Sequence, residues 1–227
     1  MSRLSMVLTF VCAIVVSGCA SERDPAAPAS QGPSQHLASS SDLAQDTELR
    51  DGWTYRAPNR DAAKYRRFMI EPVVVYAGPE ASFGQMSEEN RRRMAVLVDE
   101  EFMKTVGERF PLASSSGPDV LRIRLTLLGV EETVGALALT SRILPIGIAV
   151  NAIKGAAGES GSFTGSIELA FEAFDSQTGE LLAAAIRRAA PAIYDVGAAA
   201  STANTVRSSA RVLAKQLNEG IELAQQR

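Results

Sequence analysis

Apolar and polar residues alternate in two segments of the second half of the chain, as in a strand with one buried face. These are residues 119–130 (DVLRIRLTLLGV) and residues 165–175 (GSIELAFEAFD). Residues 67–76 (RFMIEPVVVY) are nearly all apolar or β-branched, which predicts a strand buried on both faces, with a bulge or a sheet edge at Pro72. A tight turn, DSQTGE, leads into a fourth predicted strand, residues 181–190 (LLAAAIRRAA).

Two further segments carry apolar residues at helical spacing. Ser87 and Ser201 are suited to cap their N-termini, and Glu88 and Glu89 would lie in the first turn of the first helix, where the helix dipole favours them. The apolar stripes are formed by Met94, Leu97, Val98, Phe102 and Val106 in the first helix and by Val206, Ala210, Leu213, Leu217, Ile221 and Ala224 in the second. The order β-α-β-insert-β-β-α predicts an α+β fold of one domain, a mixed four-stranded sheet with two helices on one face.

The insert, residues 134–165, is apolar and rich in small residues, and only Arg142 and Lys154 are charged before Glu159. Pro145 would break a long helix there. Three interpretations stay open: an arm that covers the core, a surface for oligomerisation or for a partner, and a segment in contact with a membrane.

The first residues have the parts of an export signal: Arg3, an apolar run over residues 4–16, and small residues up to Gly18. Cys19 follows directly, and the stretch VSGC resembles the lipobox of bacterial lipoproteins. The resemblance implies that residues 1–18 are a signal peptide, cleaved between Gly18 and Cys19. It also implies that Cys19 carries an S-diacylglycerol and an N-palmitoyl group. The alternative is an ordinary secretory signal followed by a chance cysteine.

The residue after the cysteine sorts such lipoproteins, and Ala20 in place of Asp implies transfer to the outer membrane, facing the periplasm. Residues 19–50, rich in Ser, Ala, Pro, Asp and Gln, predict the lipidated cysteine and a flexible tether. Residues 51–227 would then form one globular domain.

Composition narrows the chemistry that this domain could perform. The formal net charge of −3 does not favour a nucleic-acid partner. Cys12 would be removed with the signal, and lipidation of Cys19 would leave no thiol for a disulfide. The only histidine, His36, lies in the predicted tether, and no His/Cys cluster is suited to zinc. We therefore expect no cofactor, no metal site and no enzymatic activity.

Three carboxylates, Glu168, Glu172 and Asp175, are the candidates for a carboxylate-based hydrolase. Glu168 and Glu172 would share a strand face, but their backbones would be about 13 Å apart, which is wide for an acid–base pair. We favour a structural role, in which Arg122 and Arg124 of an antiparallel neighbouring strand meet the two glutamates.

Two basic stretches could bind anions. For residues 91–93 (RRR), pairing at i, i+4 with the two glutamates of the first turn favours a solvated helix face. Residues 52–67 (GWTYRAPNRDAAKYRR) mix aromatic and basic residues, as anionic polymer or lipid head-group sites do. We favour a strap whose rings dock on the domain while its cations stay in water.

A family resemblance rests on three stretches: TYRAPNRDAAKYRRFMIEPVVVY, GPDVLRIRLTLLGVE and SIELAFEAFDSQTGELLAAAIRR. The residues that carry it are Tyr55, Pro58, Asp61, Tyr65, Glu168, Asp175, Ser176, Thr178, Gly179 and Glu180. In this order they resemble the bacterial lipoprotein family catalogued as domain of unknown function 3313, over roughly residues 50–225. Glu71 stands where the family pattern has Asp. The resemblance implies a fold and a location but no established activity.

These features predict a lipid-anchored cell-envelope protein that serves as a non-catalytic binding or assembly accessory. Its expected partners are the membrane, through the anchor, and an envelope protein or a cell-wall component. One alternative is a homo-oligomeric ring or pore built through residues 134–165. The other is the carboxylate-based envelope hydrolase.

Overall fold

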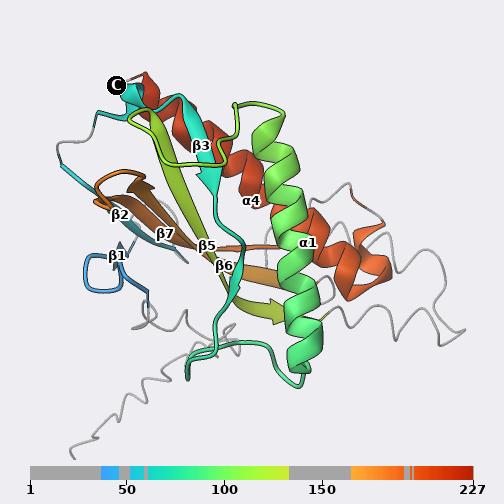
Figure 1. Ribbon diagram of the computed structural model, residues 1–227. Helices are drawn as coiled ribbons and strands as arrows, with labels where there is room; N and C mark the ends of the chain where they lie inside the picture. Colours follow the sequence, from blue (N-terminus) through green and yellow to red (C-terminus); the bar gives the residue numbers. More distant parts are fainter. Residues whose placement is uncertain are drawn as a thin grey trace, which may run out of the picture.

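The computed structural model describes residues 37–45, 52–58, 61–132, 165–191, 195 and 197–226. In these ranges the chain forms one mixed sheet of seven strands, and two long helices, α1 (Glu88–Gly107) and α4 (Thr202–Gln225), cover one of its faces (Figure 1). The strands are β1 (Ala44–Gln45), β2 (Trp53–Arg56), β3 (Arg67–Ile70), β4 (Val74–Val75), β5 (Val120–Glu131), β6 (Ser166–Asp175) and β7 (Leu181–Ala189). Two short 3₁₀ helices are η1 (Ala62–Lys64) and η2 (Ala198–Ala200). The predicted α+β class is confirmed.

The strands follow the order β1-β2-β7-β6-β5-β3, and β4 also pairs with β5. The long strands β5, β6 and β7 are antiparallel neighbours, β2 runs antiparallel to β7, and β3 and β4 run parallel to β5. The prediction of four strands is wrong, because one predicted strand divides into two and two more strands precede it.

The predicted strand 67–76 is interrupted at Pro72, which has no N–H to donate to a ladder. β3 ends at Ile70 and β4 begins at Val74. Both pieces lie beside β5 on the outer side of the sheet, and Val74 is 51% exposed. The expected sheet edge is confirmed, and the expected burial on both faces is wrong.

Strand β2 comes from the segment that we interpreted as a strap. It pairs with β7, with Trp53 opposite Ile186 and Arg56 opposite Ala183. The alternation of Trp, Thr, Tyr and Arg is the signal that could have identified it, but four residues before a proline are short for a strand.

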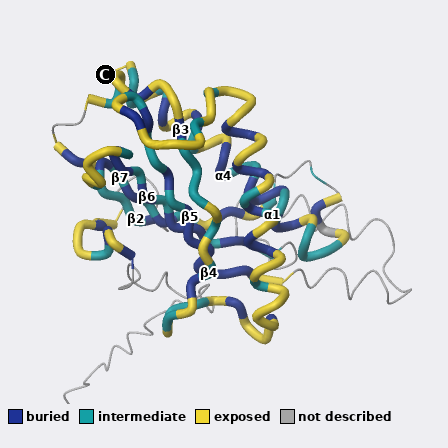
Figure 2. Tube along the Cα trace, viewed as in Figure 1, coloured by how far each residue is buried: buried dark blue, intermediate teal, exposed yellow. Residues whose placement is uncertain are grey.

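Helices α1 and α4 begin where the sequence predicts. The Ser87 hydroxyl accepts a hydrogen bond from the N–H of Asn90, and the Ser201 hydroxyl accepts one from the N–H of Asn204. Their inner faces pack on the sheet, and buried segments run through the centre of the domain (Figure 2). The largest buried side chains of this core include Phe68, Val98, Phe102, Ile123, Leu125, Leu127, Ile167, Leu169 and Leu213. Among the described residues, no helix has the length and apolar character needed to cross a membrane.

Residues 37–45, which we call the clasp, fold onto the sheet face opposite the helices. Leu37 and Leu43 are buried there in a second apolar cluster. The other buried members of this cluster are Tyr76, Leu128, Ala170, Ala184 and Ile186. The prediction of a flexible tether through residue 50 is therefore wrong for the clasp, because burial of the two leucines favours a docked chain.

Several predictions concern residues outside the described ranges. They include the signal peptide, the lipidation of Cys19 and the tether around His36. Of the insert, residues 134–165, only Gly165 is described. The three interpretations of the insert stay predictions.

Candidate functional site

Asp175 accepts hydrogen bonds on both carboxylate oxygens. Its Oδ1 accepts the N–H groups of Gln177 and Thr178 at 2.9 Å each, and these bonds close the β6–β7 turn. Its Oδ2 accepts the hydroxyl of Tyr65 at 2.8 Å and the Nζ of Lys64 at 3.0 Å. The hydrogen bond from the N–H of Thr178 lowers the pKa of Asp175 most, and the bond from the Lys64 ammonium has the next largest effect. Together they hold this pKa well below its usual range. Asp175 thus fastens the segment around η1 to the turn.

Glu172 lies beneath the clasp. It is 2% exposed, and its Oε1 accepts the N–H of Ser39 at 2.9 Å. The glutamate thus satisfies a backbone donor of the clasp that burial would otherwise leave without a partner.

Glu168 lies on the same sheet face as Glu172, opposite Gly129 of β5 and Arg188 of β7. Burial raises the pKa of Glu168, and the attraction of Arg188 offsets part of that increase. Two of the three candidate carboxylates thus have structural hydrogen bonds, and the third is a partly buried acid beside an arginine.

Glu168→Gln is expected to raise the free energy of unfolding at pH 7 by about 1 kcal/mol, because the glutamine removes a desolvated charge. The folded-state pKa of Glu168 is raised, so its penalty is absent below the ordinary glutamate pKa of about 4.3 and grows as the pH rises through the folded-state pKa. Urea unfolding at pH 4 and pH 7 measures the difference. A variant less stable than wild type at pH 7 would contradict this assignment.

The two arginines of β5 were expected to meet the glutamates of β6. Arg124 does lie opposite Glu172 in the ladder, but both guanidinium groups donate to Glu71. The bond lengths are 2.8 Å from Nη1 of Arg122 and 2.9 Å from Nε of Arg124, and both groups lie over the ring of Phe174. The expected pairing with the glutamates of β6 is therefore wrong. Glu71 binds both arginines instead, because it follows directly after β3, the parallel neighbour of β5.

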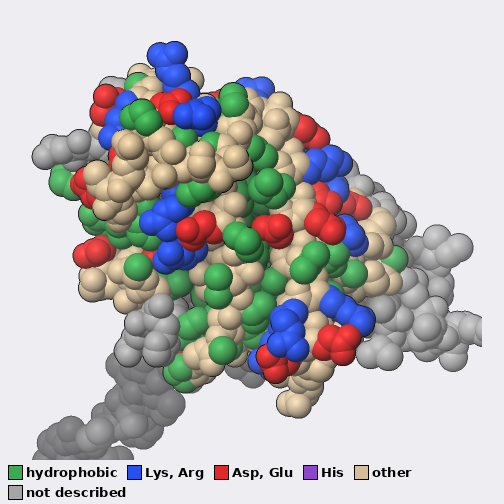
Figure 3. Space-filling view, viewed as in Figure 1, with side chains coloured by type: hydrophobic (Ala, Val, Ile, Leu, Met, Phe, Trp, Pro, Cys, Tyr) green, Lys and Arg blue, Asp and Glu red, His purple; other side chains and the backbone are tan. Residues whose placement is uncertain are grey.

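Oppositely charged side chains also lie next to each other on the surface of α1 (Figure 3). Arg92 pairs with Glu88, and Arg93 pairs with Glu89. Arg91 donates to a backbone carbonyl at the start of the helix. The interpretation of residues 91–93 as a solvated helix face is confirmed.

The stretch 52–67 docks on the domain, as expected of a strap. Tyr65 is 3% exposed, Trp53 is half-buried against the clasp cluster, and Arg67 pairs with Asp119. Arg56 is different: its side chain makes no hydrogen bond or ion pair with any residue in the described ranges, and it lines a groove.

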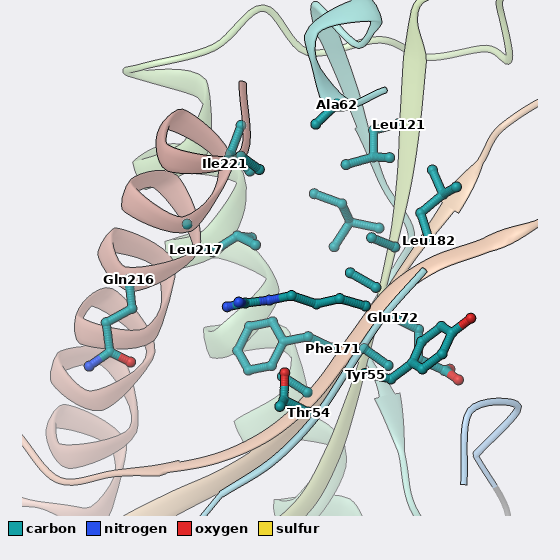
Figure 4. Close-up of a pocket in the computed structure, with 18 of the residues that line it drawn as sticks. Thr54, Tyr55, Ala62, Leu121, Phe171, Glu172, Leu182, Gln216, Leu217 and Ile221 are labelled. Carbon is teal, nitrogen blue, oxygen red and sulfur yellow. The ribbon is translucent and has the colours of Figure 1, made fainter. Parts of the chain in front are cut away.

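This groove, of about 260 Å³, lies between α4 and the strands β7 and β2 and is called the α4 groove below (Figure 4). Leu217 and Ile221 form its helix side, and they point from α4 toward the sheet in the close-up view. Ala173, Ala183 and Ala185 line its sheet side. Methyl side chains are too short to fill the space between a helix and a sheet, so the groove stays open. The alanine run of residues 181–190 is the sequence signal for it; we interpreted this run as a strand, although its alanines would equally suit a helix.

The charged residues that line the groove are Arg56, Glu172 and Arg187, but the side chain of Glu172 extends beneath the clasp, on the other face of the sheet. Glu172 directs its Oε1 to the N–H of Ser39. Nη1 of Arg187 donates to the carbonyls of Trp53 and Ile186 at 2.8 and 2.9 Å. The charged side chains on the groove side are therefore the two arginines, and both are positive. In the described ranges, no group of three His, Cys, Asp or Glu side chains could hold a metal ion.

The family model for proteins of unknown function DUF3313 matches residues 33–217. The chain belongs to the DUF3313 family. This confirms the resemblance read from the sequence, and the match includes the clasp. No curated protein matches this DUF3313 chain.

Several solved structures are similar to this DUF3313 chain at low sequence identity. A PelC dodecamer from Paraburkholderia phytofirmans is 7% identical over 70% of this chain and 96% of that chain, with a TM-score of 0.33. A DUF330 protein from Xanthomonas campestris is 9% identical over 76% and 94%, with a TM-score of 0.37. A candidate lipoprotein from Caulobacter crescentus is 12% identical over 74% and 95%, with a TM-score of 0.31.

Proposed function

We propose that this DUF3313 protein is a lipid-anchored binding protein of the cell envelope that catalyses no reaction. The observation that carries the proposal is the α4 groove, an open and largely apolar site on the helix face of the sheet. Apolar clefts with a few polar groups are the usual form of ligand sites.

The positions of the carboxylates support binding rather than catalysis. Glu172 is the acid that lines the groove, and it bonds to the clasp. Asp175 has four hydrogen-bond donors around it, and its lowered pKa suits neither a general acid nor a general base near neutral pH.

The anchor part of the proposal rests on Cys19, behind an apolar run of signal length. Lipidation there, with Ala20 next, would place the domain at the outer membrane, facing the periplasm. One acyl chain alone binds a membrane only marginally, whereas a diacylglycerol and a palmitoyl chain together would hold the protein stably.

Cys19→Ala is expected to abolish incorporation of labelled palmitate and to move the protein from the membrane fraction to the soluble fraction. The matched control is Cys12→Ala, which removes the other thiol within the apolar run and should leave both readouts unchanged. Equal labelling of Cys19→Ala and wild type would contradict the anchor.

Binding at the groove is tested by photocrosslinking in growing cells. A photoreactive amino acid at Leu217, inside the groove, is expected to give a crosslinked adduct. The same group at Lys215, which is exposed two residues earlier on α4, is the control and should give none of that adduct. No adduct, or the same adduct from both positions, would contradict a binding role for the groove.

A further inference from the structure

We propose that the α4 groove holds a single acyl chain that ends in an anionic group, with that group at Arg56. This inference names the ligand class of the binding site and rests on the proposed function.

The dimensions of the groove fit one hydrocarbon chain. From Ala183 to Arg187 the groove follows β7 for about 13 Å at the usual rise of about 3.3 Å per residue. The volume of about 260 Å³ lies at the small end of the range for ligand sites, so the groove suits a small apolar ligand such as one acyl chain.

The lining has the apolar character that an acyl chain requires. Ala173 lies opposite Ala183, and Phe171 lies opposite Ala185, so the methyl groups and the ring form a continuous surface on the sheet. The apolar stripe of α4 faces this surface across the groove (Figure 4). Burial contributes about 0.8 kcal/mol for each methylene of a chain.

The position of Arg56 supplies the charge for the head group. Arg56 of β2 lies opposite Ala183 of β7, which is the first of the β7 alanines on the sheet side of the groove. Arg56 therefore lies at one end of this apolar surface. Its side chain is exposed, and none of the described residues forms an ion pair with it. A guanidinium group binds carboxylate or phosphate oxygens through paired N–H donors. An acyl chain in the groove would thus place its anionic end beside a cation.

Gly220 provides a variant that blocks the groove without damaging the fold. It lines the groove from α4, and a Cβ at this position meets no atom within 4 Å. Glycine inside a helix is destabilising, so Gly220→Leu should hold or improve the stability of the domain while its side chain occupies the groove.

The test uses the chain from residue 19 onward with Cys19→Ser, so that no attached lipid competes. The probe is cis-parinaric acid, whose fluorescence rises in an apolar site, and it is displaced by dodecanoate, dodecyl phosphate or dodecan-1-ol. Wild type is expected to bind the probe, and Gly220→Leu should weaken binding at least tenfold with an unfolding midpoint equal to or above that of wild type. Arg56→Gln should weaken either anion about tenfold and leave dodecan-1-ol unchanged, whereas the control Arg66→Gln should change neither.

Three results would overturn the inference. Equal probe binding by wild type and Gly220→Leu would place the lipid site elsewhere. Equal affinity for dodecanoate and dodecan-1-ol would remove the anionic group from the ligand. No probe binding, together with a protein captured from Leu217 by photocrosslinking, would leave the proposed binding function in place and exclude the acyl ligand.

Discussion

Asp175→Ala is expected to lower the free energy of unfolding by about 3 kcal/mol, because it removes the acceptor of four hydrogen bonds, several of them buried or half-buried. The turn would lose its two N–H bonds, and the hydroxyl of the buried Tyr65 would lose its partner. Urea unfolding followed by circular dichroism measures the change. The control is Asp119→Ala, which removes the acceptor of Arg67 in a surface ion pair and should shift the midpoint far less.

The pH dependence of stability gives a second readout for Asp175. Its folded-state pKa is lowered, so its contribution to stability is present above the unfolded pKa of about 3.9 and is lost as the pH falls through the folded-state pKa. The stability difference between wild type and Asp175→Asn should be full above about pH 5 and shrink below about pH 4. A difference that does not vary with pH would mean that the charge of Asp175 contributes nothing.

The double variant Leu37→Ala and Leu43→Ala is expected to lower the free energy of unfolding by about 3 kcal/mol, because both side chains are buried in the cluster beneath the clasp. Loss of the clasp would also expose the carboxylate of Glu172, which the N–H of Ser39 now contacts. Thermal and urea unfolding of the full mature chain would measure this.

The control for the clasp is Leu223→Ala, which makes the same kind of truncation once, at a side chain that is 57% exposed on α4. It should change the free energy of unfolding by no more than about 0.5 kcal/mol. If the double variant were as stable as this control, the clasp would contribute no stability, and the prediction of a tether through residue 50 would be restored for this segment.

The long elements of the fold could be predicted because their signals are local. The alternation in β5 and β6, the helical stripes and the two serine caps specify elements of ten residues or more, whatever packs against them. The clasp and β2 are too short for such a signal. They are ordered by burial against β7 and its neighbours, and only the tertiary structure reveals those contacts.

The candidate site was harder to predict than the fold. Carboxylates in a sequence suggest catalytic groups, yet Asp175 and Glu172 form hydrogen bonds that hold the domain together. The α4 groove arises where small side chains of β7 face a helix, and a run of alanines does not reveal which helix will lie above it. The mixed aromatic and basic stretch 52–67 offered several cations for an anionic ligand, and the structure singles out Arg56, whose side chain has no partner among the described residues and lies beside this groove.

Docking of the clasp also sets how far the domain could lie from a lipid anchor. If Cys19 carries the lipid, covalent geometry limits the distance from Cys19 to Trp53 to about 120 Å when no residue between them is fixed to the domain. With Leu37 packed on the sheet, the limit from Cys19 to the domain falls to about 65 Å. The clasp thus roughly halves the reach of the anchored protein, and any ligand or partner of the groove must come within that radius of the membrane, plus the width of one domain.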